Sequence, residues 1–152
     1  MIYRAATLSD ITPKGIDLVK EATEETSWGD EAFCPLRSLD TLSSMIESPT
    51  DLVAVATTDS GDELTGVVIG TTFDAMFSPT LHAAMNVWYV RPAYRGGWAG
   101  YRLARIYRDW ARLMGATTVH FEVNSGVNND LAEKLACKLG FRQIGTTHKA
   151  MF

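Results

Sequence analysis

The stretch V-R-P-A-Y-R-G-G-W-A-G, residues 90–100, decides the fold because it joins an apolar strand to an amphipathic helix through a turn rich in arginine and glycine. Gly96 and Gly97 allow the backbone to approach a ligand closely and to adopt conformations that a Cβ atom would forbid. The helix that follows points its free N–H groups and the positive end of its dipole at the same place. The stretch therefore predicts an anion-binding site with room for a diphosphate.

The turn differs from two common phosphate-binding motifs, because it carries Arg95 and matches neither G-x-x-x-x-G-K-[ST] nor G-x-G-x-x-G. It resembles the signature of the GNAT family of acyl-CoA N-acyltransferases, V-x-P-x-x-[RQ]-x-x-G-x-[GA]. Four positions match this signature: Val90, Pro92, Arg95 and Gly100. Trp98 stands where the family has its central glycine. An indole there would project outward, to stack on an adenine or cover the diphosphate, or it would narrow the site and abolish binding.

A second resemblance to the same family lies downstream, in N-D-L-A-E-K-L-A-C-K-L-G-F, residues 129–141. The family pattern is N-x-x-A-x-x-L-Y-x-x-L-G-F, and it fits at Asn129, Ala132, Leu135, Leu139, Gly140 and Phe141. Ala136 replaces the tyrosine that often serves as general acid. This variant also resembles GNAT proteins of bacteriophages. With both motifs in family order, the resemblance covers nearly the whole chain.

Length and composition agree with one compact domain over residues 1–152, since 152 residues are enough to bury a substantial core. A hydrophobic content of 46% without a long apolar run excludes a disordered chain and a membrane-spanning one. The first residues lack the apolar middle of a signal peptide. Two cysteines, Cys34 and Cys137, suggest reduced thiols, so we expect a cytoplasmic protein.

The net charge of −4 hides two halves of opposite sign. Residues 1–90 have four Lys and Arg against fourteen Asp and Glu, which gives −10, and residues 91–152 have ten against four, which gives +6. Six arginines cluster around the turn and its helix: Arg91, Arg95, Arg102, Arg105, Arg108 and Arg112. They predict either a positive field around the phosphate site or an ordinary solvated helix face. The acidic half includes Glu24, Glu25, Asp30 and Glu31, and it suggests a cationic acceptor.

Hydrophobic periodicity predicts alternating strands and helices. We expect strands at residues 2–6, 51–58, 64–73, 85–90 and 117–123, helices at residues 11–22, 38–46, 98–114 and 128–139, and one or two closing strands at residues 142–152. With the family resemblance, this order implies an α+β (mixed α/β) GNAT-like fold. Such a fold has a central twisted, mostly antiparallel sheet of six or seven strands, with a splayed strand pair, flanked by about four helices.

The resemblance implies an enzyme, a GNAT-type N-acetyltransferase that moves an acetyl group from acetyl-CoA to a primary amine by direct attack in a ternary complex. The acceptor would be a small molecule, such as a polyamine or an aminoglycoside-like compound, or a protein amino group. The pantetheine arm would lie between splayed strands at residues 86–90 and 119–123. The implied cofactor-binding residues are Trp88, Tyr89, Val90, Arg95, Gly96, Gly97, Trp98, Ala99, Gly100 and Asn129. No metal is expected, because the histidines lack ligand spacing.

Both positions that usually transfer protons in the family are vacant, since Ala136 replaces the acid and residues 81–84 contain no glutamate base. The candidate catalytic residues are His82 and Glu122, with Asp74, Asp30 and Glu31 as further carboxylates. Activity is compatible with these vacancies, because holding two reactants in contact lowers a barrier by about 7–11 kcal/mol, against about 3–5 kcal/mol for a typical acid or base.

Two alternatives to an active acetyltransferase remain open. The vacant positions and Trp98 also fit a catalytically reduced GNAT-fold protein that binds CoA or serves a regulatory or structural role. The arginine-rich helix would suit nucleic acid, but the acidic chain lacks an aromatic platform, which disfavours nucleic acid as a partner. No membrane partner is expected. The last expected strand leaves an edge at which an edge-to-edge homodimer would form.

Overall fold

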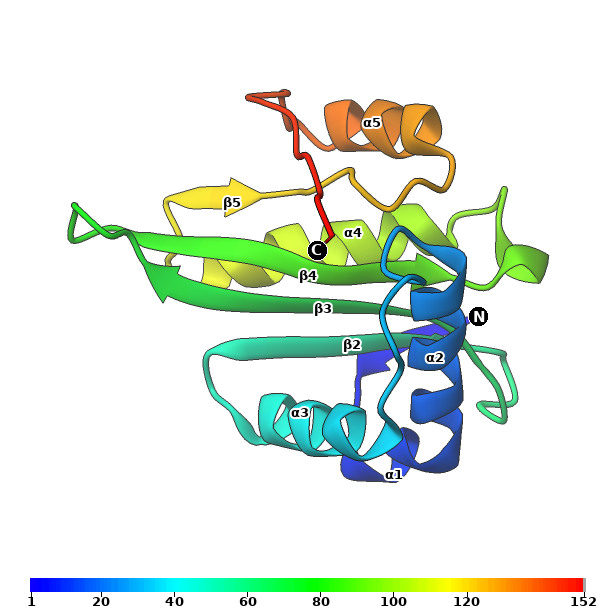
Figure 1. Cartoon of the computed structure of the whole chain (residues 1–152). Coiled ribbons are helices and arrows are strands. Elements are labelled where there is room, and N and C mark those ends of the chain that lie inside the picture. Colours follow the sequence, from blue (N-terminus) through cyan, green and yellow to red (C-terminus); the bar gives the residue numbers. More distant parts are fainter. Residues whose placement is uncertain (152) are drawn as a thin grey trace.

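A computed structural model describes residues 1–151 and shows one sheet of five strands with helices on both faces (Figure 1). The strands cross the sheet in sequence order: β1 (Ile2–Ala5), β2 (Asp51–Thr57), β3 (Leu64–Asp74), β4 (Leu81–Val90) and β5 (Thr118–His120). The strands β1 to β4 pair antiparallel, whereas β5 runs parallel to β4. The predicted α+β architecture with a mostly antiparallel sheet is therefore confirmed.

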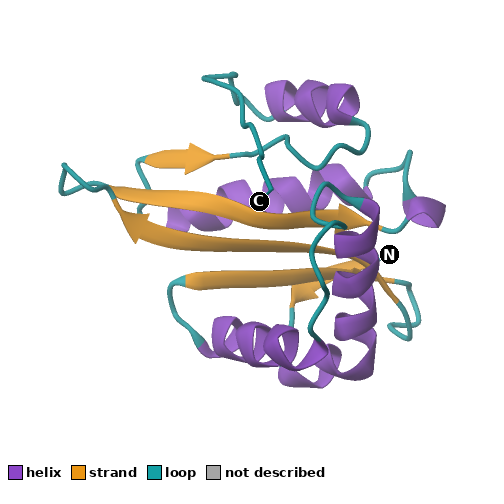
Figure 2. Cartoon of the chain, viewed as in Figure 1, coloured by secondary structure: helices purple, strands orange, loops and turns teal. Residues whose placement is uncertain are grey.

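Four helices of ten to fifteen residues flank the sheet, as expected: α2 (Ile16–Glu25), α3 (Pro35–Glu47), α4 (Ala99–Leu113) and α5 (Asn129–Lys138). Two short segments precede α2: α1 (Leu8–Asp10) and a turn at Ile11–Gly15, in which the extended backbone of Thr12 (φ −114°, ψ 128°) interrupts the helix. Figure 2 shows α2 and α3 on one face of the sheet and α4 on the other. No helix within residues 1–151 combines the length and apolar character needed to cross a bilayer.

Two hydrophobic layers hold the helices to the sheet. The layer under α2 and α3 contains Ile11, Leu18, Leu42, Val53, Val55, Val67, Ile69 and Tyr89. The layer under α4 contains Ala54, Val68, Ala83, Leu103, Tyr107 and Ala111. Successive residues of a strand point to opposite faces, so the central strands β2 and β3 need apolar side chains on both sides. This requirement explains their near-continuous apolar runs.

The expectation of six or seven strands is not confirmed, because residues 142–151 form no strand and residues 121–123 leave the sheet. The last expected position, residue 152, lies outside the described part of the chain. A stable strand needs an apolar face to bury. Residues 142–151 are mostly polar or small, and their two large apolar side chains, Ile144 and Met151, are exposed. The tail therefore crosses the molecule without joining the sheet.

The helix boundaries agree within one residue with the predicted ones at α4 and α5. They differ at α3, which begins three residues early, and at α2, which spans Ile16–Glu25 in place of the predicted residues 11–22. Pro35 opens α3, because proline is preorganised for a first helical position. In α4 the buried face is formed by Leu103, Tyr107 and Ala111, whereas Leu113 is 88% exposed. Residues of a helix are separated by about 100° of rotation, which carries Leu113 away from this face.

Tyr107 anchors the short strand β5 to the helix α4. Its ring is completely buried, and its hydroxyl donates a hydrogen bond of 2.8 Å to the carbonyl of His120, the last residue of β5. Gly70 of β3 leaves the space for this ring, because a Cβ atom there would lie 2.7 Å from the Tyr107 ring. The packing thus fixes the end of β5, the point at which the chain leaves the sheet.

Candidate active site

The strands β4 and β5 separate soon after they meet. Their parallel pairing covers three residues and ends where Ala84 faces His120. Beyond this point, residues 121–125 continue without pairing to β4 and turn toward α5, as the yellow segment of Figure 1 shows. The edge of β4 at residues 85–90 therefore presents backbone groups to an open wedge. Residues 86–90 and 119–123 were the pair expected to splay.

A β-bulge in β4 lies at the opening of the wedge. Ile69 of β3 pairs with Val87, whereas the next residue, Gly70, pairs with Met85, so Asn86 is the extra residue. A bulge bends its strand and strengthens the local twist. The side chain of Asn86 is exposed beside the wedge. The bulge thus bends β4 at the level where it parts from β5.

The turn after β4 carries a run of unpaired backbone donors. Within the described chain, the N–H groups of residues 96–101 make no hydrogen bond, and the first satisfied amide is that of Arg102, which donates to Trp98. Gly96 has a φ of +84°, which favours glycine, and a Cβ atom on Gly97 would meet nothing within 4 Å. The dipole of the fifteen-residue helix α4 adds positive potential here. Six such donors form a cradle for an anion.

A groove of about 200 Å³ runs from this cradle along β4 to α5. Seven of the ten predicted cofactor residues line it: Trp88, Tyr89, Val90, Arg95, Gly96, Gly97 and Gly100. The indole of Trp88 donates to the carbonyl of Gly100 (3.1 Å), and a Cβ atom on Gly100 would lie 3.0 Å from the Trp88 ring. The glycine therefore lets α4 begin close to β4, at the base of the groove.

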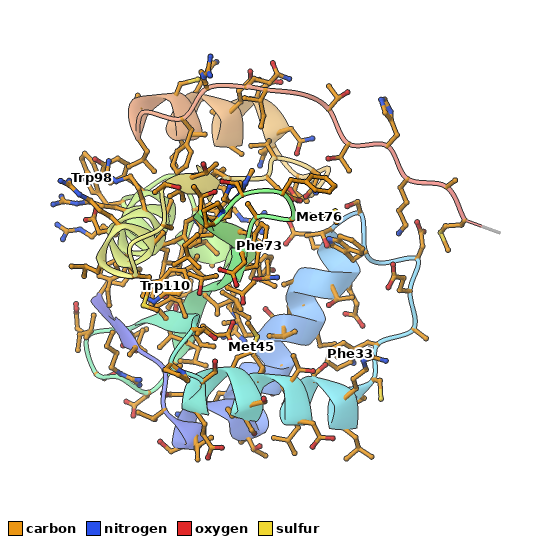
Figure 3. The ribbon with its side chains drawn as sticks, turned by 90° about the vertical axis from the view of Figure 1, so that its left-hand side faces the viewer. Phe33, Met45, Phe73, Met76, Trp98 and Trp110 are labelled. Atoms are coloured by element: carbon orange, nitrogen blue, oxygen red, sulfur yellow. The ribbon has the colours of Figure 1, made fainter. Side chains whose placement is uncertain are left out.

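Trp98 lies outside the groove. Its side chain is 72% exposed, contacts the Tyr101 ring edge-on with 5.7 Å between centroids, and stands at the periphery of the molecule in Figure 3. Its backbone N–H remains one of the six free donors of the cradle. The indole therefore leaves the groove open.

The other two predicted cofactor residues contribute differently. Ala99 is buried under α4 and offers the cradle only its N–H group. Asn129 accepts a hydrogen bond from the N–H of Gly126 (3.2 Å) and lines a neighbouring pocket, whereas Asn128 lines the groove. Leu131 is 63% exposed and forms part of the groove wall. Its apolar side chain faces the wedge and not the core.

Arg95 is held by the protein itself. Its two Nη atoms donate to both carboxylate oxygens of Glu25 (2.6 Å each), and its Nε donates to the carbonyl of Val90 (2.7 Å). The guanidinium also lies 5.4 Å from the ring centroid of Tyr89, whose hydroxyl donates to Glu25 (2.9 Å). Arg95 therefore fixes the shape of the turn, and Glu25 is not a free charge for an acceptor.

A second ion pair repeats this arrangement one helical turn away. Arg91 donates to both oxygens of Glu21 (2.8 Å each) and to Glu63 (3.0 Å). Glu21 and Glu25 are four residues apart on α2, and Arg91 and Arg95 are four residues apart after β4. The opposite charges of the two sequence halves thus meet at this contact.

The pKa values of this cluster reflect its hydrogen bonds. Hydrogen bonds from Arg95 hold the pKa of Glu25 below its ordinary value, although burial acts in the opposite direction. Burial, and secondly the hydrogen bond to Glu25, raise the pKa of Tyr89 to about 12. Glu25 therefore stays ionised and Tyr89 stays protonated at neutral pH.

A second, smaller pocket of about 120 Å³ adjoins the groove. Its polar lining includes Asn86, Glu122 and Asn124, and the Trp28 ring forms part of its wall. The exposed carboxylate of Glu122 accepts a hydrogen bond from the side-chain amide of Asn124 (2.9 Å). Among residues 1–151, no three His, Cys, Asp or Glu side chains are grouped to hold a metal ion. The pocket offers a carboxylate at the open end of the wedge.

His82, the other candidate catalytic residue, lies in the paired part of β4. Its Nδ1 is 3.2 Å from Nε2 of His120, and the Phe73 ring packs against both imidazoles. His120 stands opposite Ala84, the last paired residue of β4. The sequence did not indicate this histidine pair, because its members are 38 residues apart. Glu122 lines the smaller pocket, whereas His82 does not.

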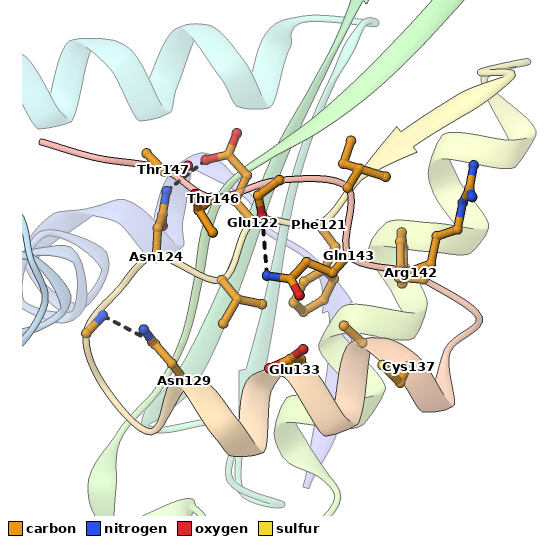
Figure 4. A pocket seen from close by; sticks show the side chains of 16 residues that line it. Phe121, Glu122, Asn124, Asn129, Glu133, Cys137, Arg142, Gln143, Thr146 and Thr147 are labelled. Carbon is orange, nitrogen blue, oxygen red and sulfur yellow. Dashed lines mark hydrogen bonds between the residues drawn. The ribbon is translucent and has the colours of Figure 1, made fainter.

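The vacant acid position also borders an open space. Ala136 and the exposed Cys137 of α5 line a pocket of about 480 Å³ together with Phe121, Glu133 and the tail (Figure 4). This pocket lies where residues 142–147 cross the segment that follows β5 without pairing to it. Alanine supplies no proton donor, so residue 136 does not act as an acid.

The acetyltransferase (GNAT) family model matches residues 17–141. No curated protein matches the chain. The solved structures that match include a putative acetyltransferase from Agrobacterium tumefaciens (16% identity, TM-score 0.76, 100% of both chains covered) and a transcriptional regulator from Bacillus halodurans (17%, 0.79, 99% of both). Another is glucosamine-6-phosphate N-acetyltransferase from Arabidopsis thaliana (14%, 0.78, 99% of this chain and 97% of that one).

At these identities the likeness of the structures shows the fold alone, and the family follows from the match over residues 17–141. The narrower resemblance to bacteriophage proteins is not supported by any of these matches.

We expect Glu25→Gln to weaken the contact between α2 and the turn in a pH-dependent way. The pKa of Glu25 is lowered by folding, so its pairing stabilises fully above the ordinary value of 4.5 and is lost as the pH falls through the lowered pKa. Urea denaturation should show that the variant is less stable at about pH 7 and loses less stability than the parent toward about pH 3. Glu24→Gln, at an exposed position of the same helix, is the control. Identical pH dependence in parent and Glu25→Gln would contradict the pairing.

Proposed function

The chain belongs to the acetyltransferase (GNAT) family, and we propose that it transfers an acetyl group from acetyl-CoA to a primary amine. One observation carries this proposal: six free backbone donors, an open groove along β4 and a polar pocket at its far end follow one another. A diphosphate, an extended pantetheine arm and a reacting amine would need these three features in this order. The family generally uses acetyl-CoA.

The residues at the groove suit the parts of acetyl-CoA. The N–H groups of residues 96–101 would hold the diphosphate, with the dipole of α4 adding to the attraction. The unpaired edge of β4 at residues 87–90 would hydrogen-bond the amides of pantetheine as an added strand does. Leu131 and Leu135 of α5 offer an apolar wall. Asn129 would act at the start of α5, beside Asn128, which lines the groove.

The reaction needs little chemistry beyond orientation. The lone pair of a neutral amine attacks the thioester carbonyl carbon, a C–N bond forms, and the C–S bond breaks to release the CoA thiolate. The amine nitrogen loses one proton. The thiolate is a good leaving group whether or not an acid protonates its sulfur. Bringing the reactants together lowers the barrier by about 7–11 kcal/mol, which exceeds the contribution of an acid. The absence of a tyrosine at Ala136 is therefore tolerable.

Glu122 is the better placed of the two candidate proton acceptors. Its carboxylate lies on the pocket beside Asn86, and the hydrogen bond from Asn124 restricts its position. His82 would act only through His120, which stands opposite Ala84. We therefore propose that Glu122 takes the amine proton, directly or through a water, and that His82 has a secondary role.

The acceptor, the cellular location and the oligomeric state belong to the same proposal. The Arabidopsis neighbour is described as acting on glucosamine-6-phosphate. In this chain the lining of the small pocket includes three aromatic side chains, two amides and a carboxylate, which suits an amine-bearing and cationic acceptor. A cytoplasmic location and a homodimer remain predictions.

A non-catalytic role is the second candidate. It rests on Ala136 in place of the acid and on the lack of a glutamate base at residues 81–84, and one structural neighbour is described as a transcriptional regulator. A protein of this kind would bind CoA in the same groove without transferring the acyl group. Binding and turnover measurements on one preparation separate the two roles.

Gly97→Glu should abolish most of the stabilisation that acetyl-CoA gives. A ligand at about one hundred times its dissociation constant stabilises a protein by about 2.7 kcal/mol, which raises the melting temperature by several degrees. A Cβ atom fits at Gly97, so the variant folds and places a negative charge at the cradle. Thermal melting with and without acetyl-CoA measures the effect. Gly145→Glu, at another open and exposed glycine, should keep the full shift. An unchanged shift in Gly97→Glu would show that the diphosphate does not bind at the turn.

Glu122→Gln should lower kcat/KM for an amine by about 10²–10⁴ while leaving acetyl-CoA binding intact, because the amide cannot take the amine proton. Release of free thiol measures turnover. Glu133→Gln removes a nearby exposed carboxylate of α5 and should change little. A large loss in His82→Asn together with normal activity in Glu122→Gln would transfer the role to the histidine pair.

A further inference from the structure

The loop that follows α2 is fastened over the open end of the wedge. The N–H of Ser27 donates to the carbonyl of Ser125 (2.7 Å), and the hydroxyl of Ser27 donates to the carbonyl of Asn124 (2.8 Å). These residues are about one hundred positions apart in the chain. The loop at residues 26–31 is therefore part of the pocket wall and not a free excursion.

This loop surrounds a primary ammonium group, that of Lys149 in the tail. The Nζ of Lys149 donates to the carbonyl of Ser27 (2.9 Å) and lies 5.3 Å from the ring centroid of Trp28. The carboxylates of Glu31 and Asp30 are 3.6 Å and 3.8 Å from the same nitrogen. We call these four groups, from residues 27, 28, 30 and 31, the ammonium cage. A carbonyl, an aromatic face and two carboxylates are the partners that an ammonium seeks.

The cage adjoins the pocket in which the amine would react. Trp28 belongs to both, because its ring contacts Lys149 and its side chain lines the pocket that contains Asn86 and Glu122. Figure 1 shows the tail, in red, running down across the segment that follows β5 and ending at the level of β4. A positively charged group in the cage would therefore lie beside a group that is bound in the pocket.

The negative charge of the ammonium cage is larger than the single positive charge of Lys149. Asp30 and Glu31 carry two negative charges, and Lys149 is the one cation within 4 Å of them among residues 1–151. The side chains of all three are partly exposed, at 34% for Lys149, 67% for Asp30 and 56% for Glu31. Exposed ion pairs of this kind are weak and screened by salt. A soluble cation can therefore displace Lys149.

We propose that the ammonium cage binds one charged end of an aliphatic di- or polyamine acceptor, whose other amino group enters the pocket beside Glu122. Lys149 fills the cage when the acceptor is absent and competes with it. A lone lysine side chain carries a single amino group and cannot occupy the cage and react at once, whereas a polyamine has both groups. The acetyl transfer in this scheme rests on the proposed function, but occupancy of the cage does not.

The test is calorimetric titration of spermidine, without acetyl-CoA, into the whole protein and its variants. Lys149→Ala and Lys149→Gln should each tighten spermidine binding by about two- to fivefold, because the Lys149 ammonium, which is held by weak exposed ion pairs, no longer competes for the ammonium cage. Trp28→Ala and Glu31→Gln should weaken binding. Lys138→Ala, an exposed lysine of α5, is the matched control and should leave binding unchanged.

Three results would overturn the proposal: equal spermidine affinity in the parent and both Lys149 variants, propylamine binding as tightly as spermidine, or a lysine-containing peptide doing so. Propylamine has one amino group and tests the need for two. Since no acetyl-CoA is present, these results are independent of acetyl transfer, which the Gly97→Glu experiment tests separately.

Discussion

The hydrogen-bonded ion pair between Glu25 and Arg95 fixes the geometry on which the site depends. It joins the end of α2 to the turn after β4, and all three guanidinium nitrogens of Arg95 are satisfied inside the protein. The turn therefore keeps its shape without a ligand, and the N–H groups of residues 96–101 stay free for an anion. Preorganised donors of this kind bind without a further cost of ordering.

The contact also shows that part of the acidic charge of the N-terminal half is paired within the protein. Glu21 and Glu25 belong to the acidic half, and they form ion pairs with Arg91 and Arg95 of the basic half. The acidic charge that suggested a cationic acceptor survives elsewhere, at Asp30 and Glu31. The arginine of the motif serves as a support for the backbone, and the main chain offers the donors.

Features set by neighbouring residues were predictable from the sequence, and features set by distant residues were not. The β2–β3 hairpin, α4 and the glycine turn follow from local apolar periodicity and backbone freedom, and the structure confirms these elements. The prediction of closing strands was wrong, because a strand needs a neighbouring strand to pair with and residues 142–151 pair with none. The bulge at Asn86, the partner of Glu25 and the contact of Lys149 with Ser27 depend on residues between 16 and 122 positions away, which no local pattern reveals.

The central claim is that the backbone amides of residues 96–101 hold the diphosphate of acetyl-CoA, and amide NMR tests it directly. In a titration of the ¹⁵N-labelled protein with acetyl-CoA, the amides of Gly96, Gly97 and the first turn of α4 should show the largest shifts, because they gain hydrogen bonds that they lack without the ligand. Shifts confined to other parts of the chain, with these amides unmoved at saturation, would contradict the account.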